Sequence, residues 1–232
     1  MRASRGDTQL GGDDVDRALA ELVLERLGGS RSAVERDPRA RVRLVEAVER
    51  AKIALSDRAS VRVFDPFFAG IGDSVVHVDL ELSRDDVDRV ARRLVERTLR
   101  CIDDALRDAR LRPTELDRIL LVGGASKMPL VAAMIAEHLG RPAQLADEAD
   151  LAVARGAALL AGRAAGADVN EVLVDVTPHT LSAGAVSIDD DDANDLTAVP
   201  IIPRNTVVPT ERTHRLFTIH DRQRAVRIPI AQ

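Results

Sequence analysis

The 232-residue sequence predicts a mixed α/β fold followed by a smaller β segment. Apolar residues recur at helical spacing over 13–27 and 38–55, whereas 60–64, 75–81 and 118–122 have the pattern of short strands. Strands that alternate with helices of this length are typical of an α/β layer. Prolines at positions 178, 200, 203, 209 and 229 leave no room for a long helix near the C-terminal end.

The first two helices follow from apolar spacing and from the residues at their ends. The first apolar face is formed by Val15, Leu19, Leu22, Val23 and Leu27. Glycines 28 and 29 end this helix, and Pro38, which suits a first-turn position, begins the second, which runs to Leu55.

Two alternating runs, 60–64 and 75–81, predict half-buried strands separated by a loop that contains Pro66 and the 70–72 segment. Ser83 and Asp86 then have the spacing of a capping box, with Asp in place of the usual Glu. We therefore expect a long helix that begins at this point and is broken at Pro113.

The second half of the chain predicts a strand over 118–122 and helices over about 129–139 and 151–163. Small residues follow, and an acidic run occupies 189–192. We place a linker at 164–176 and β structure after it, with alternating runs at 216–219 and 225–230.

Composition excludes several functional classes. Apolar residues make up 45% and charged residues 31%, which is typical of a folded globular protein, and the net charge of −5 with interleaved signs gives no nucleic-acid-binding face. The single cysteine, Cys101, can form no disulfide within the chain and is expected to be a small core residue. No apolar run is long enough to span a membrane and no secretory signal is visible, so we expect a cytoplasmic protein. His77, His138, His179, His214 and His220 have no spaced partners, so we assign none of them to a metal.

The pair Gly123-Gly124 follows a predicted strand and precedes a predicted helix. Glycine lets the backbone bend sharply and approach a flat ligand closely, although such a pair is also common in a plain turn. The N–H groups at the start of the next helix would suit a phosphate or a polar ring edge. Both lysines of the chain, Lys52 and Lys127, lie in the motifs that we assign to ligand binding.

Glu49, Lys52 and Ser56 are spaced i, i+3 and i+7, so they share one face of the predicted second helix. This face can offer a carboxylate, an ammonium and a hydroxyl to a ribose and a purine. The alternative is a surface Glu–Lys pair without a ligand. Asp150 is open to two interpretations as well, a nucleotide-site residue or the N-cap of the helix over 151–163.

Residues 6–16, which read GDTQLGGDDVD, resemble a run of the DnaK-type heat-shock chaperones, the seventy-kilodalton class. Five further motifs are similar to this family in the same order: 49–56 (ERAKIALS), 118–129 (RILLVGGASKMP), 150–158, 172–178 (VLVDVTP) and 202–210 (IPRNTVVPT). The resemblance implies an actin-like ATPase second lobe, in part, over 6–163. It further implies an interdomain linker over 164–176 and the first strands of a peptide-binding β-sandwich, incomplete, over 177–232.

The resemblance implies an adenosine site formed by Glu49, Lys52, Ser56, Gly123, Gly124, Lys127 and Asp150. Lys127 stands where many members have an arginine that stacks on the base, and Ala125 replaces a frequent serine, so weaker adenine binding is expected. The implied linker residues are Val172, Leu173, Val174 and Asp175, and the implied peptide-cleft residues are Leu216, Ile219, Val226 and Ile228.

The family activity implied is ATP-driven binding and release of unfolded polypeptides, with a nucleotide-exchange factor at 11–90 and a J-domain co-chaperone at the linker. The elements that hold Mg²⁺ and the β- and γ-phosphates of ATP or ADP, and the catalytic lysine, precede the matched part of the family. We therefore expect no catalytic residue in this chain, no hydrolysis by the chain alone and weak or no peptide binding. The glycines at 11 and 12 are not a Walker loop, because no Gly-Lys-Ser/Thr follows them.

Two other functions are compatible with parts of the sequence. The chain could be a truncated, non-enzymatic module that binds co-chaperones or complements a separately encoded first lobe. It could also be a small-molecule kinase of actin-like architecture, although the motifs at 172–178 and 202–210 argue against a kinase.

Overall fold

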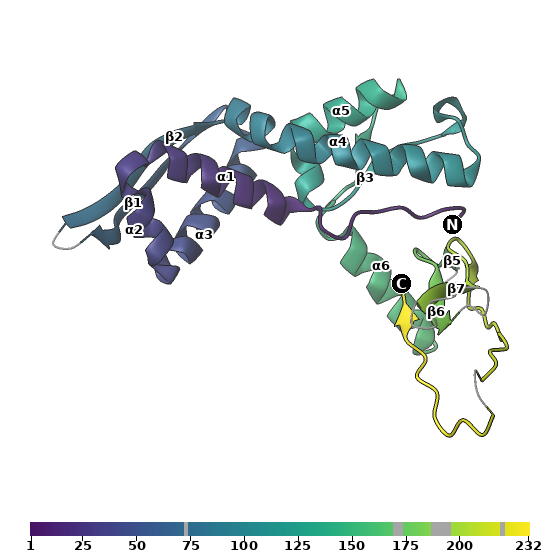
Figure 1. The fold of residues 1–232 in the computed structure, drawn as a ribbon. Helices are drawn as coiled ribbons and strands as arrows, with labels where there is room; N and C mark the ends of the chain where they lie inside the picture. Colours follow the sequence, from purple (N-terminus) through teal and green to yellow (C-terminus); the bar gives the residue numbers. More distant parts are fainter. Residues whose placement is uncertain (72–73, 169–173, 187–195, 219–220) are drawn as a thin grey trace.

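The computed structural model describes residues 1–71, 74–168, 174–186, 196–218 and 221–232. It contains a body of three helices packed on a long β-hairpin, a long helix that leads from this body to a second group, and a small set of strands near the C-terminal end (Figure 1).

The first body consists of α1 (Gly12–Arg26), α2 (Arg31–Arg36) and α3 (Pro38–Leu55), with a 3₁₀ turn, η1 (Gly28–Ser30), between α1 and α2. The predicted helical period of α1 is confirmed, because Leu19 and Val23 are fully buried. Asp37 caps α3 by accepting a hydrogen bond from the Arg39 N–H, and Pro38 occupies the first turn.

The hairpin pairs β1 (Ser60–Ile71) with β2 (Ser74–Ser83) in antiparallel register, from Ser60 opposite Ser83 onward. Both strands are longer than the sequence predicted. The expected loop around Pro66 is instead an irregularity between Asp65 and Ala69, since proline lacks the N–H that a regular ladder requires. Val78 and Leu82 bury their side chains against the helices.

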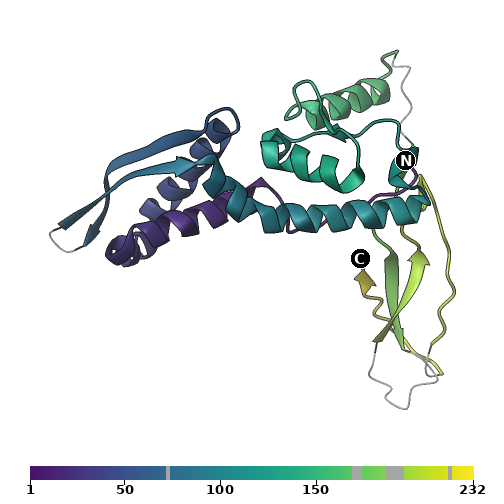
Figure 2. The ribbon, with the colours of Figure 1, turned by 90° about the horizontal axis from the view of Figure 1, so that it is seen from above.

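Helix α4 (Arg84–Ala109) begins at the predicted capping box, in which the Ser83 hydroxyl accepts a hydrogen bond from the Asp86 N–H and the Asp86 carboxylate accepts one from the Ser83 N–H. It ends at Arg110, whose φ of 56° is left-handed. Figure 2 shows α4 running from the hairpin body to the second group of elements.

The second group contains β3 (Leu120–Leu121) and β4 (Gln144–Leu145), which pair in parallel, and α5 (Pro129–Leu139). Two 3₁₀ turns, η2 (Pro113–Glu115) and η3 (Gly124–Lys127), connect these elements. Leu121, Ile135 and Leu139 form a small second core to which α4 adds partly buried residues. Cys101, predicted to be a core residue, is only half-buried on α4.

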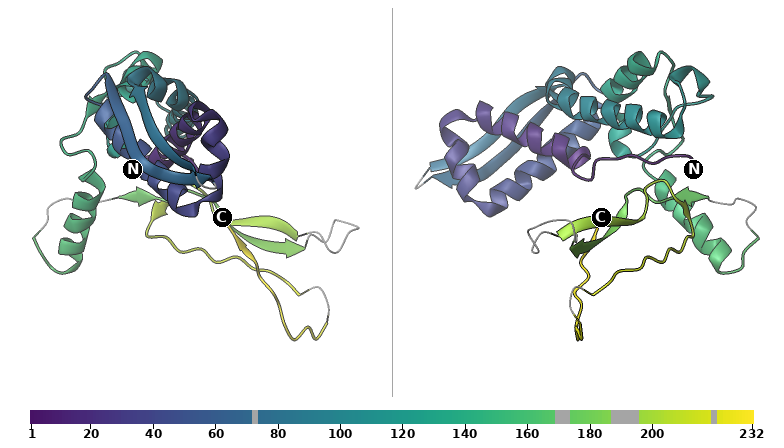
Figure 3. Two further views of the ribbon diagram at one scale, coloured as in Figure 1. Left: turned by 90° about the vertical axis from the view of Figure 1, so that its left-hand side faces the viewer. Right: turned by 45° about the vertical axis from the view of Figure 1, so that its right-hand side comes forward.

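Helix α6 (Ala152–Ala164) contains no buried residue, although its sequence is largely apolar. Val153 is 72% exposed and Leu159 is 51% exposed. The two views of Figure 3 show this helix projecting away from the hairpin body.

The C-terminal strands form two small sheets. β5 (Asp175–Val176) pairs with β8 (Val207–Val208), and β6 (Leu181–Val186) lies between β7 (Leu196–Ile202) and β9 (Ile230–Ala231). Strands were predicted over 216–219 and 225–230, but 211–218 and 221–229 contain none, and pairing begins only at Ile230. An alternating pattern fixes which side chains share a face, but a strand also needs a neighbour to pair with. Among the described helices, none combines the length and apolarity that crossing a membrane requires.

Candidate functional site

Lys52 lies on the inner side of α3, where its side chain is almost completely buried. Its Nζ donates to Asp16 Oδ2 at 2.7 Å and to the carbonyl oxygen of Gly12 at 3.3 Å. The structure therefore pairs Lys52 with α1, so the alternative of a surface pair with Glu49 is wrong.

Gly12 is the point at which three parts of the chain meet. A Cβ atom at this position would lie 3.3 Å from Lys52 Nζ and 3.8 Å from the Cβ of Ala125. The first of these distances is tighter than most real contacts, so a glycine allows the close approach. The start of α1, the inner face of α3 and the turn η3 are thus brought together.

Burial raises the pKa of the Asp16 carboxyl, and the hydrogen bond and positive charge of Lys52 oppose this effect. The negative charge of Glu49 also contributes to the raised pKa, so this carboxylate is close enough to act on Asp16. Glu49 is exposed, and Ser56 is half-buried at the C-cap of α3.

In the glycine turn, the backbone conformation at Gly123 is one that favours glycine. Gly123 has a φ of 89°, and its N–H donates to the carbonyl of Ala149 at 2.6 Å. The Ser126 hydroxyl donates to the Gly123 carbonyl at 2.6 Å. The predicted helix does not start directly after the glycines, because η3 intervenes and uses the N–H of Ser126 and of Met128 within its own turn.

Lys127 and Asp150 were both predicted to be site residues, and the structure brings them together. Their side chains are 3.1 Å apart and each is about half exposed. The Lys127 ammonium holds the pKa of Asp150 below its ordinary value. Asp150 does not cap α6, because the N-cap is Leu151.

Asp16 and Gly12 are parts of this site that residue-by-residue reasoning missed, although both lie in the 6–16 run. The available signal was a charge on the apolar face of the first predicted helix, one position after Val15. A carboxylate at such a position requires a partner.

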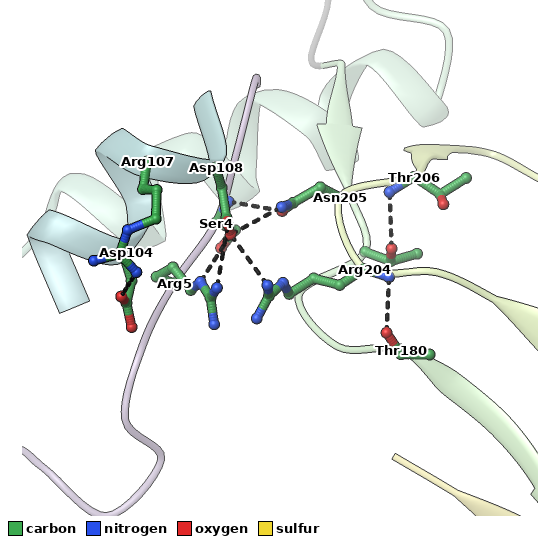
Figure 4. A network of polar contacts seen from close by, with 10 residues as sticks. Ser4, Arg5, Asp104, Arg107, Asp108, Thr180, Arg204, Asn205 and Thr206 are labelled. Carbon is green, nitrogen blue, oxygen red and sulfur yellow. Dashed lines mark hydrogen bonds and ion pairs between the residues drawn. The ribbon is translucent and has the colours of Figure 1, made fainter. Parts of the chain in front are cut away.

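A second polar cluster surrounds Asp108 in the last turn of α4 (Figure 4). Its carboxylate accepts hydrogen bonds from Arg5 at 2.8 Å and from the Asn205 side-chain amide at 3.1 Å, and Arg204 lies 3.3 Å away. The N-terminal segment, α4 and the turn between β7 and β8 are thereby connected.

The candidate linker and peptide-cleft residues lie elsewhere. Val172, Leu173 and Ile219 fall outside the described residues. The N-terminal amine of Met1 donates to the carbonyl of Val174, and Asp175 begins β5. Leu216, Val226 and Ile228 are 39%, 58% and 48% exposed on segments without assigned strands. Within the described part of the chain, no group of three or more His, Cys, Asp or Glu side chains could hold a metal ion.

Comparison with known proteins identifies the family. The family described as Hsp70 protein matches residues 1–232. The chain belongs to the Hsp70 family. This membership implies an actin-like ATPase fold and confirms the resemblance drawn from the motifs.

The Hsp70 relatives include the chaperone protein DnaK of Mycoplasmopsis pulmonis, which is 36% identical over 99% of this chain and 37% of its own length. The chaperone protein dnaK3 of Synechococcus elongatus is 36% identical over 100% of this chain and 30% of its own length. The chaperone protein DnaK of Mycoplasmopsis synoviae is 34% identical over 99% and 37%. The chain thus spans about a third of the length of the curated Hsp70 relatives that it matches.

Proposed function

We propose that residues 6–163 form the adenosine-facing side of the nucleotide-binding domain of a DnaK-type chaperone, which binds ATP or ADP. The observation that carries this proposal is the convergence at Gly12 of Lys52 from α3 and Ala125 from η3. Two motifs that are far apart in the sequence and were assigned to one ligand thus lie side by side.

Each candidate residue has a role that suits a nucleoside. Lys52 and Ser56 would donate hydrogen bonds to ribose or purine, and Glu49 would accept one from a ribose hydroxyl. Gly123 and Gly124 would let the base lie against the backbone. Lys127, oriented by Asp150, would cover the face of the base.

We propose that the parent activity is ATP-dependent binding and release of unfolded polypeptides, and that this chain alone does not hydrolyse ATP. The Mg²⁺ and the β- and γ-phosphates would be held by parts of the relatives outside the matched third. Phosphoryl transfer depends on positioning and on neutralising charge, which the nucleoside contacts alone do not supply.

The rest of the chain would couple nucleotide binding to polypeptide binding. Residues 164–176 would be the linker that a J-domain co-chaperone engages, and 177–232 the first strands of a peptide-binding β-sandwich. The three-stranded antiparallel sheet of β7, β6 and β9 supports this assignment. Residues 11–90 would bind a nucleotide-exchange factor, and the compartment would be the cytoplasm.

Calorimetric titration of the chain with adenosine and with ADP tests the nucleoside site. Glu49→Ala and Ser56→Ala should each weaken adenosine binding by about tenfold, as expected for a lost hydrogen bond. Glu46→Ala, an exposed change one turn earlier on α3, is the matched control and should have no effect. A chain that binds neither ligand would contradict the proposal, as would equal affinities in all three variants.

A second candidate function is that of a non-enzymatic module that associates with a separate protein supplying the first lobe. The exposed apolar residues of α6 favour it, since Val153, Leu159 and Leu160 have no covering element among the described residues. Coexpression with the part of a DnaK relative that precedes the matched region should give a stable complex that Leu159→Ser weakens, whereas chains that do not associate would argue against this function.

A further inference from the structure

The candidate site contains a buried carboxylate that the proposed function does not use. Asp16, Lys52 and Asp86 are the buried charged residues of the described chain. One carboxylate oxygen of Asp16 accepts the bond from Lys52, and the other, Oδ1, is buried without a hydrogen-bond partner. Asp16 thus uses one of its two carboxylate oxygens to hold Lys52 and leaves the other without a hydrogen bond.

The ion pair with Asp16 gives the Lys52 ammonium a defined orientation, and the pair as a whole has no net charge. An ammonium group has three N–H donors, of which one points to Asp16 and another to the Gly12 carbonyl. The remaining donor can serve a ligand, but the positive charge is already balanced at 2.7 Å.

The same charge balance occurs at the last residue of η3. Lys127 is the second lysine of the chain, and its ammonium lies 3.1 Å from Asp150. Both lysines of the candidate site are therefore neutralised by an aspartate. Such a site offers hydrogen-bond donors without an uncompensated cation.

We propose that Asp16 is a positioning and specificity-determining residue, which fixes the Lys52 ammonium and cancels its charge so that this site selects an uncharged ribose hydroxyl over a phosphate. This inference rests on the proposed nucleoside site and names the part of the nucleotide that the site accepts. Asp150 has the same effect on Lys127.

The test is a calorimetric titration of the 232-residue chain with adenosine and, separately, with orthophosphate, at low and high salt. The unaltered chain should bind adenosine with little salt dependence. Asp16→Asn frees the ammonium, so adenosine affinity should fall about tenfold, while orthophosphate affinity should rise about tenfold and decrease with salt. Adding Lys52→Met to Asp16→Asn should abolish the gain for orthophosphate.

Asp86→Asn is the matched control, because Asp86 is also a buried aspartate with a basic partner, Arg26, away from the glycine turn. It should lower stability but leave the ratio of the two affinities unchanged. If Asp16→Asn does not fold, as judged by circular dichroism, the ratio of adenosine to orthophosphate affinity is measured instead in Asp150→Asn, where the altered residue is more exposed. An unchanged ratio in the folded variant overturns the inference alone, whereas an unaltered chain that does not bind adenosine overturns the proposed function and the inference together.

Discussion

Arg5 and Asp108 are 103 positions apart in the sequence, yet Arg5 Nε donates to Asp108 Oδ2 at 2.8 Å. The second guanidinium nitrogen, Nη2, donates to the other carboxylate oxygen at 3.2 Å, which makes the pair bidentate. The same carboxylate also binds Asn205. One aspartate thus ties the N-terminal segment and the turn between β7 and β8 to α4.

Asp108→Ala should release these contacts. We expect faster hydrogen–deuterium exchange in residues 1–5 and 203–206 and little change in the hairpin body, since the contacts are local and partly exposed. Asp104→Ala is the control, because Asp104 pairs with the exposed Arg107 one turn earlier. Equal exchange in both variants would show that the Asp108 cluster does not hold the N-terminal segment or the turn between β7 and β8.

Acid should detach the N-terminal segment. The hydrogen bond from Arg5 lowers the pKa of Asp108. The hydrogen bond from the Gln9 N–H, and to a lesser extent the one from the Arg97 side chain, lowers the pKa of Asp7. A carboxyl whose folded pKa is depressed stabilises the fold above its unfolded pKa of about 3.9, and loses this effect as pH falls through the folded value. The Arg5 Nε signal in NMR should therefore shift toward that of a free arginine only below about pH 4. A signal that moves between pH 6 and 8 would contradict this assignment, and Asp108→Ala should lack the acid transition.

Gly123 and Gly124 should differ in their tolerance of a side chain. Gly123→Ala places a Cβ on a residue with a φ of 89°, so the free energy of unfolding should fall by about 1–2 kcal/mol. Gly124→Ala is the matched control, because a Cβ there meets nothing within 4 Å and the backbone is not left-handed, so its effect should stay within about 0.5 kcal/mol. Urea unfolding measures both, and equal losses would show that the turn does not depend on the Gly123 backbone.

Ser83→Ala should destabilise the start of α4. It removes the hydroxyl that accepts the Asp86 N–H, so the free energy of unfolding should fall by about 1 kcal/mol in urea. Asp85→Asn, an exposed change in the same first turn without a capping bond, is the control and should have a smaller effect. A Ser83→Ala variant with an unchanged free energy of unfolding would mean that the cap does not contribute to stability.

Local sequence signals predicted the helices whose first residues are themselves start signals, such as a first-turn proline or a capping box. The bounds of α3 and α5 agree with the predictions because each has a proline in its first turn, and α4 starts at its capping box. The partner of Lys52 could not be predicted from spacing on α3, since Asp16 belongs to another helix and burial selected it. The strands expected after residue 210 did not form, because alternation alone supplies no neighbouring strand.

Helix α4 contributes to both apolar clusters and contains 26 residues, which at 1.5 Å per residue is about 39 Å. A rigid rod of this length acts as a lever. A tilt of about 5° at Ser83 would displace the Asp108 end by about 3 Å, enough to break the bonds to Arg5 and Asn205. A small rotation of the hairpin body would thereby be converted into the making or breaking of discrete polar contacts at the other end of α4.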